Sequence, residues 1–316
     1  MSSLNTNVSA MTALQTLSAT NKNLATTQSR ISTGFRVGEA ADNAAYWSIA
    51  TTMRSDNKAL STVQDALGLG AGKLDVAYTG MNAAIEVVDE IKAKLVAARG
   101  ASDEDKSKIQ SEISELQNQL KSIGQSASFS GGNFLAHNDT VAEQIVASFS
   151  RDSGGKVAVG TIEFDVTESR LFGLDATTGA VVVDGGTTGG LLSRTLEGAD
   201  GTAIAGTTVL NLNIHDGTTI ATSATIDSLI SGVDAVMADM ITAASDLGAI
   251  KKRVDMQADF VSKLQDAIDR GVGQLVDADM QAESARLSAL QVQQQLGIQS
   301  LSIANGNAQN ILALFN

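Results

Sequence analysis

The sequence predicts a mainly α-helical fold with β structure inserted in its middle. The expected architecture is a long antiparallel coiled-coil helical bundle built from both chain ends, with a β-hairpin and a small β-rich outer domain between them. Apolar residues recur in alternating steps of three and four before residue 128 and again after residue 225, which is the repeat of supercoiled helices. Between these stretches, residues 131–232 hold 16 of the 29 glycines. The chain contains no proline, which suits long unbroken helices.

The longest heptad stretch runs from Ile226 to Ile268. Its stripe consists of Ile226, Leu229, Val233, Val236, Met240, Ala243, Leu247, Ile250, Val254, Gln257, Val261, Leu264 and Ile268. Two interpretations of the single polar member, Gln257, stay open: it is tolerated at an exposed point, or it fixes the register by hydrogen bonding across the bundle. One helix cannot bury such a stripe alone, so partner helices are required.

Two earlier stretches have the same period and are the predicted partners. The seam residues predicted in them are Leu60, Val63, Leu67, Leu74, Met81, Val88, Ile91 and Leu95, then Ile109, Ile113, Leu116, Leu120 and Ile123. Because both stretches precede the glycine-rich middle, the seam is expected to close within one subunit. The run Gly68–Lys73 is interpreted as helix rather than as a phosphate-binding loop, because that loop needs Gly at position 67 and Ser or Thr at position 74.

The composition changes at Phe129. Short runs of β-favouring residues replace the heptads, at Val141–Phe149, Val157–Val166, Val181–Val183, Val209–Ile214 and Thr218–Thr222. Residues 151–155 read Arg-Asp-Ser-Gly-Gly, a turn signal that predicts a hairpin from the first two runs. The other runs predict a small β-domain rich in Thr and Gly.

Both chain ends are predicted to be helices with broad apolar faces and little charge. Residues 1–33 carry only Lys22 and Arg30, and Leu287–Asn316 carries no charged residue. The residues predicted to pack between subunits are Leu4, Val8, Met11, Leu14, Leu17, Leu24, Ile31, Leu287, Leu290, Leu296, Leu301, Ile303, Ile311, Leu314 and Phe315. A soluble monomer does not keep such faces in water, and contacts between copies that do not close into a ring produce a filament.

Composition argues against several classes of function. A net charge of −13 is unsuited to nucleic acid or an anionic membrane, because both attract clustered basic residues. The chain has no cysteine, which excludes disulfides and thiolate metal sites. No apolar run is long enough for a membrane span, and residues 1–33 lack the basic start and apolar run of a secretion signal.

No residue is predicted to be catalytic or to bind a cofactor or a metal. The two histidines, His137 and His215, are interpreted as solvated surface residues. Asp277 and Asp279 form a carboxylate pair, but at a predicted helix start, where acids cap the helix dipole.

Tyr46 and Trp47 are the densest aromatic site in a chain with 3% aromatic residues. They are expected to pack either between the bundle and a terminal helix or between subunits. The sequence does not separate these two interpretations.

Several segments resemble bacterial flagellins. The segments are Leu4–Ala10, Arg30–Val37, Ala40–Ala45, Leu247–Ile250, Val276–Met280 through Ser302–Asn305, and Asn310–Phe315. The likeness covers residues 1–135 and 240–316, and together these segments are a specific signal. The variant Tyr46-Trp47-Ser48 is similar to the alphaproteobacterial branch of the family.

The resemblance implies a structural subunit, not an enzyme, that polymerises into the flagellar filament for swimming motility through coiled-coil packing of its terminal helices. It implies no cofactor and an extracellular location reached through flagellar type III export. The implied partners are other flagellin subunits in a homopolymer or mixed filament, an export chaperone on the C-terminal segment, and cap and hook-associated proteins. Nucleic acid and a membrane span are not among them.

Five segments follow from the heptads and the resemblance. Residues 1–36 and 271–316 are the predicted filament-core helices. Residues 37–170, with the hairpin, and 225–270 are the two parts of the helical bundle. Residues 171–224 are the predicted variable, surface-exposed β-rich domain.

Two other functions stay open. A hook–filament junction protein shares similar terminal helices, but the match at 276–305 and the Asn-Ile-Leu-Ala-Leu ending favour a flagellin. A surface enzyme or binding module on a coiled-coil stalk requires a convergent polar site in 130–225, and none is apparent.

One stretch departs from the flagellin pattern. Flagellins sensed by the animal flagellin-recognising Toll-like receptor carry a Gln-Arg-x-Arg-Glu-Leu-type run in the matching helix. Here Asp89–Leu95 places Glu90 and Lys94 where Arg and Leu are expected. The departure implies a poor agonist of that receptor.

Overall fold

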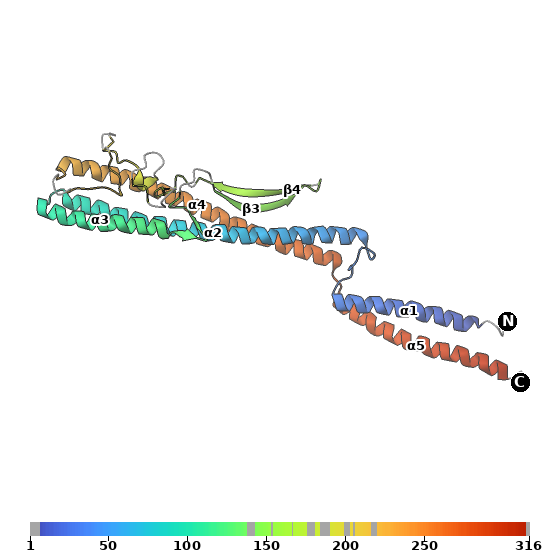
Figure 1. Cartoon of the computed structure of the whole chain (residues 1–316). Coiled ribbons are helices and arrows are strands. Elements are labelled where there is room, and N and C mark those ends of the chain that lie inside the picture. Colours follow the sequence, from blue (N-terminus) through green and yellow to red (C-terminus); the bar gives the residue numbers. More distant parts are fainter. Residues whose placement is uncertain are drawn as a thin grey trace. The chain divides into compact units, whose positions relative to one another are not determined.

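The computed structural model describes residues 7–137, 143–152, 154–165, 167–175, 181–183, 190–198, 203–204, 206–215 and 220–313, the last seven of these by their backbone only. The elements are α1 (Val8–Thr33), α2 (Ala44–Ala98), α3 (Asp103–Ser126), β1 (Ser128–Phe129), β2 (Gly132–Asn133), β3 (Glu143–Arg151), β4 (Val157–Phe164), the 3-10 helix η2 (Leu191–Ser193), α4 (Ser223–Val276) and α5 (Met280–Ala313) (Figure 1). The mainly α fold class is confirmed, with two small antiparallel sheets between the helices of the two chain ends.

Two compact units divide the chain. Met1–Lys58 with Leu264–Asn316 forms one, here called the terminal unit, and Ala59–Lys263 forms the other, the bundle unit. Both boundaries fall inside long helices, α2 and α4.

Local signals set the helix ends. The Asn7 side chain accepts a hydrogen bond from the Ala10 N–H at the start of α1, and Gly34 ends that helix with φ of 75°, a conformation that favours glycine. Ser102 caps the start of α3: its hydroxyl accepts the Asp105 N–H, and three acids occupy the first turn of the helix.

The core of the bundle unit lies along the predicted heptad seam. Its buried members are Leu60, Val63, Leu67, Leu74, Met81, Val88, Ile91 and Leu95 in α2, Ile113 and Leu120 in α3, and Leu229, Val233, Val236, Met240, Leu247, Val254 and Val261 in α4. Ile109, Leu116, Ile123 and Ile250 are half-buried. Leu264 and Ile268, which belong to the terminal unit, are half-buried as well.

Ion pairs mark the direction and register of α2 and α4 within the bundle unit. The pairs are Lys92–Asp234, Arg99–Asp227 and Asp75–Lys251. In each pair the two residue numbers add up to 326, as expected for antiparallel helices in one register. Exposed ion pairs stabilise by only about 0.2–1 kcal/mol each, so these pairs select the register more than they hold the bundle together.

Strands β3 and β4 form the predicted hairpin. Ile145 lies opposite Ile162, and the ladder shifts between Val146 and Ser148, where a β-bulge lies. The inner side chains of the hairpin, among them Ile145 and Ile162, are buried.

The hairpin approaches α2 at Gly70. A Cβ atom added there would lie 2.6 Å from the Ile145 Cγ2 atom, so no larger residue fits without movement. This contact explains why a helix interior keeps a glycine that costs about 1 kcal/mol relative to alanine.

Gln257 binds the hairpin rather than another helix of the bundle. It is half-buried, and its Nε2 donates to the Ala147 carbonyl at 2.9 Å, beside the bulge. The polar gap in the heptad stripe therefore connects α4 to β3, which neither sequence interpretation had included.

The strand predicted at 209–214 is wrong, because these residues form turns and coil. Side chains of α3, rather than a neighbouring strand, bind the backbone of residues 209–214. Gln117 Nε2 donates to the carbonyls of Val209 (2.9 Å) and Leu212 (3.0 Å), and Gln110 binds the same segment at its end. The apolar residues of the run are buried. The apolar pattern of residues 209–214 therefore indicates burial of the segment rather than a strand.

The remaining β runs form little regular structure among the described residues. Val181 makes a single bridge to Leu174, where a strand was predicted at 181–183. Val141, Val166 and the first two residues of the run 218–222 lie outside the described residues. Glycine-rich sequence of this kind has low β propensity.

Candidate assembly surface on the terminal helices

Helices α1 and α5 pair with each other in the terminal unit (Figure 1). Asn7 Nδ2 donates to the Ala304 carbonyl at 2.9 Å, and Gln294 Nε2 donates to Asn21 Oδ1 at 2.8 Å. Because the start of α1 meets the later part of α5, the two helices are antiparallel.

Apolar side chains remain outside this helix pair. Val8, Met11, Leu14, Leu296 and Ile303 are exposed, with exposed fractions of 57–69%. Leu17, Leu24, Ile31, Leu287 and Leu301 are half-buried, and Leu290 is buried. Of the other residues predicted to pack between subunits, Leu4, Leu314 and Phe315 and the side chain of Ile311 lie outside the described residues.

A groove of about 750 Å³ lies along the pair. Small residues such as Ser9, Ala13 and Gly297 line it, with Val8 and Leu296 beside them. The two helices thus leave space between them that their own side chains do not fill.

One ion pair lies between the helices and joins the half-buried Arg30 to the buried Glu283. Arg30 Nη1 lies 3.2 Å from Glu283 Oε1, and Arg286 lies 3.7 Å from the same oxygen. The other oxygen of Glu283 is buried and has no hydrogen-bond partner among the described residues. A buried carboxylate needs such compensation, so the pair fixes how α1 and α5 align.

The α1–α2 and α4–α5 connections form a joint. The Arg36 N–H donates to the Val276 carbonyl at 2.7 Å, and the Ala278 N–H donates to the Gly34 carbonyl at 2.8 Å. Val37 packs with Val276 and two further buried residues in a small core.

Asp279 caps α5. Its Oδ1 accepts hydrogen bonds from the backbone N–H groups of Gln281 and Ala282. The prediction that the carboxylates at 277–279 serve a helix start is confirmed for Asp279.

The other residues considered as possible binding or catalytic sites lie in helices, bridges and loops of the fold. Gly68–Lys73 lies within α2, so it forms no phosphate-binding loop. His137 is half-buried, and His215 forms an isolated bridge to Ile220. In the part of the chain that the structure describes, no three His, Cys, Asp or Glu residues are placed to hold a metal ion.

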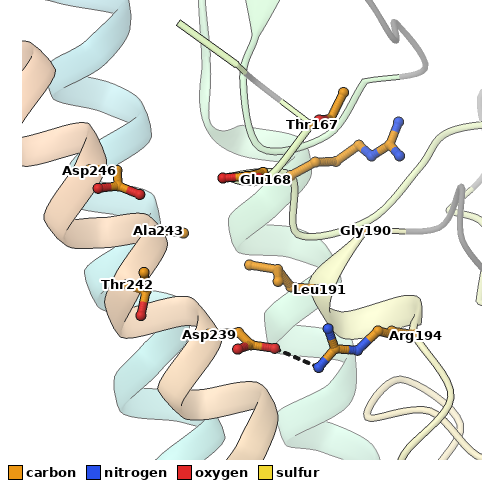
Figure 2. A pocket seen from close by; sticks show the side chains of 10 residues that line it. Thr167, Glu168, Gly190, Leu191, Arg194, Asp239, Thr242, Ala243 and Asp246 are labelled. Carbon is orange, nitrogen blue, oxygen red and sulfur yellow. Dashed lines mark hydrogen bonds and ion pairs between the residues drawn. The ribbon is translucent and has the colours of Figure 1, made fainter.

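A polar pocket of about 390 Å³ lies between α4 and the 167–194 segment of the bundle unit (Figure 2). Arg194 pairs with Asp239 at 2.5 Å across it. Burial lowers the pKa of the Arg170 guanidinium, which also lines the pocket. Among the described residues, the lining contains no Ser–His or Cys–His pair, which is the usual arrangement for nucleophilic catalysis.

Glu90 and Lys94 lie on α2. Glu90 is exposed, and Lys94 forms an ion pair with Glu112 of α3. The hydrogen bond and charge of Glu112 raise the pKa of the Lys94 ammonium above its ordinary value. One of the two residues that depart from the receptor motif, Lys94, therefore also joins α2 to α3.

Sequence reasoning missed the polar contacts that align the terminal helices. Asn7, Asn21 and Gln294 were not predicted to take part in the pairing, although they bind across the helix pair. Arg30 and Glu283 are charged residues in helices that carry few charges. Their isolation is the sequence signal from which this ion pair could have been predicted.

Helical ends with unfilled apolar faces define a structural protein built to associate with copies of itself. The bacterial flagellin N-terminal helical region matches residues 4–140, and the C-terminal helical region matches residues 230–315. Flagellin C of Rhizobium meliloti (strain 1021) is 52% identical over 100% of this chain and 99% of its own length, and a flagellin of Brucella melitensis biotype 1 is 50% identical with the same coverage. The chain therefore belongs to the bacterial flagellin family, and its relatives lie in the alphaproteobacterial branch indicated by Tyr46-Trp47-Ser48.

A putative flagellar hook-associated protein from Vibrio parahaemolyticus is 15% identical to this chain, with a TM-score of 0.49 over 75% of this chain and 100% of its own. A score this low bears on neither fold nor function. No helix among the described residues has the length and apolar character of a membrane span.

Proposed function

We propose that this chain enters the flagellar filament by packing its α1–α5 pair against the same pair of neighbouring subunits. As a flagellin it is a structural subunit of the extracellular filament used for swimming, and not an enzyme. The observation that carries the proposed packing is the set of exposed apolar residues along both helices, beside an unfilled groove.

Burial of these faces supplies the driving force. Covering an exposed Val, Leu, Ile or Met side chain contributes about 1.5–3 kcal/mol. The five most exposed predicted residues, Val8, Met11, Leu14, Leu296 and Ile303, are 57–69% exposed, so burying the exposed part of all five contributes about 5–10 kcal/mol. Association costs about 4–15 kcal/mol in lost translational and rotational freedom. Burial of these faces is similar in size to this cost, so further contacts determine how tightly the subunits assemble.

The heptad seam has a different role in this proposal. Its residues close the bundle inside each subunit, a role supported by the burial of most of them without any partner chain. Residues 1–36 and 271–316 are proposed as the filament core, 37–170 and 225–270 as the bundle, and 171–224 as the outer, variable part.

Other flagellar components are proposed as partners. The charge-free segment Leu287–Asn316 offers an apolar helix to an export chaperone before assembly, and cap and hook-associated proteins contact the filament ends. A junction protein between hook and filament is not proposed for this chain, because relatives named flagellin match it over their whole length.

Glu90 and Lys94 are proposed to make the chain a poor agonist of the flagellin-recognising Toll-like receptor. An acid stands at one motif position, and the base at the other is already paired with Glu112. Purified monomer is expected to activate a reporter cell weakly, and full-strength activation by that monomer would overturn this proposal.

The packing proposal is tested by seeded growth of point variants. Leu296→Asn and Ile303→Asn place polar groups on the exposed face of α5 and are expected to slow filament elongation. Ile241→Asn is the control, because Ile241 lies on α4 and is also more than half exposed. Equal elongation by all three variants would contradict packing through α5.

A further inference from the structure

The inner face of α2 extends beyond the core that covers it. Ala50 is 1% exposed, and Met53 packs against the same small core of Val37, Val272 and Val276 in the terminal unit. Tyr46 and Trp47 lie three to four residues before Ala50, which places them on the same side of the helix one turn earlier. They are 42% and 39% exposed.

The uncovered turn has the composition of an interface centre. Residues 44–53 contain no charged residue, and Ile49 is exposed beside the two aromatics. Tyr and Trp are enriched, and charges depleted, at the centres of protein interfaces. Neither the Tyr46 hydroxyl nor the Trp47 indole N–H has a hydrogen bond to any described residue.

This turn is held rigidly to the helices proposed to polymerise. The joint between residues 34–37 and 275–278 ties the start of α2 to α1 and α5. Arg36 Nη2 donates to the Leu275 carbonyl at 3.0 Å, and the Arg54 guanidinium stacks 4.7 Å over the Phe35 ring. Any neighbour that packs on the α1–α5 pair therefore finds this turn in a fixed place on the same unit.

We propose that Tyr46, Trp47 and Ile49, the α2 patch, form a second contact between copies of this chain in the filament. The occupant is a neighbouring copy of the chain, because a filament subunit is surrounded by its own kind. The contact rests on the proposed assembly through α1 and α5, and it supplies part of the extra interaction that those helices need.

The unmodified chain tests this contact, because Trp47 is its one tryptophan. The emission of Trp47 and its quenching by acrylamide are compared for monomer and for seeded filaments at equal chain concentration. Polymerisation is expected to shift the emission to shorter wavelength and to lower the quenching constant severalfold. Filaments in which Trp47 is quenched as strongly as in the monomer would overturn this contact while leaving assembly through α1 and α5 intact.

Substitution measures what the contact contributes. Trp47→Ser is expected to raise the critical monomer concentration by about thirtyfold, the size of a central aromatic residue in an interface. Trp47→Phe is expected to restore most of the loss, and Val96→Ser, at an exposed position of the same helix, to change nothing. Circular dichroism of each monomer shows whether its helices are retained.

The outcomes separate the two proposals. A critical concentration that is unchanged in Trp47→Ser contradicts the α2 patch alone. Failure of the unmodified chain to grow from seeds contradicts the proposed assembly and the α2 patch with it.

Discussion

At the scale of single residues, polar side chains set the positions that apolar burial leaves undefined. Gln257 joins α4 to the bulge of β3, Gln117 holds the turns at 209–214, and Ser102 begins α3. Each satisfies backbone groups that the regular ladder of a helix or sheet does not. A buried group left without a partner costs about 1–3 kcal/mol.

Gln257→Leu is expected to keep the bundle and to loosen the hairpin. Leucine continues the heptad stripe, but the Ala147 carbonyl loses its donor, a net hydrogen bond of about 1 kcal/mol. Hydrogen exchange should accelerate about fivefold in β3. Met256→Leu, at an exposed neighbouring position, is the control, and unchanged exchange in β3 would contradict this role of Gln257.

The start of α3 is expected to depend on pH through Asp105. The hydrogen bond from the Ser102 hydroxyl, and then Lys108, lower the pKa of the Asp105 carboxyl below its ordinary value. A lowered pKa in the folded chain means that the stabilisation is present above the ordinary pKa and is lost as pH falls through the lowered one. Ser102→Ala should raise the Asp105 pKa towards its ordinary value in an NMR titration, whereas Ser111→Ala should not. Equal Asp105 pKa values in both variants would contradict this explanation.

At the scale of elements, the periodicity of apolar residues predicted the features that depend on local sequence. The heptads placed the long helices and their buried faces, because a 3.5-residue repeat reports which side of a helix is covered. The structure of residues 209–214, which were predicted to form a strand, could not be determined in this way. Gln117 is 92 residues from Val209, so no local pattern reveals that a helix side chain replaces a strand partner there.

The same limit applies to the candidate site. The apolar stripes of the terminal helices were visible in the sequence, but the exposure of Tyr46 and Trp47 follows from where Val272 and Val276 end the small core. That boundary depends on the joint between residues more than 200 positions apart. Sequence alone therefore left the role of the two aromatics undecided.

The α2–α4 register is expected to respond to charge reversal. Asp234→Lys places two lysines opposite each other at the Lys92 position and should lower the free energy of unfolding of the bundle by about 0.2–1 kcal/mol. Adding Lys92→Asp restores an opposite-charge pair and should recover most of this loss in a denaturant titration. A double variant no more stable than Asp234→Lys would show that the two residues do not interact.

At the scale of the whole molecule, the two units differ in what they leave exposed. The bundle unit closes most of its heptad seam within one chain, although side chains such as Val96, Ile241 and Met256 stay exposed on it, whereas the terminal unit exposes apolar side chains of α1, α5 and the α2 patch. Apolar patches that a chain does not cover itself mark interaction sites. In the proposed assembly, the subunit closes its heptad seam by itself and relies on other copies to cover its terminal helices.

The most direct test of this division is seeded growth of a chain that ends at Arg286 and so lacks Leu287–Asn316. Electron microscopy should show no elongation of short seeds by the truncated monomer, while circular dichroism shows that the helices of the bundle unit are retained. The full-length chain, at the same concentration and with the same seeds, should grow filaments. Undiminished growth of the truncated chain would contradict the claim that the terminal helices are the polymerising surface.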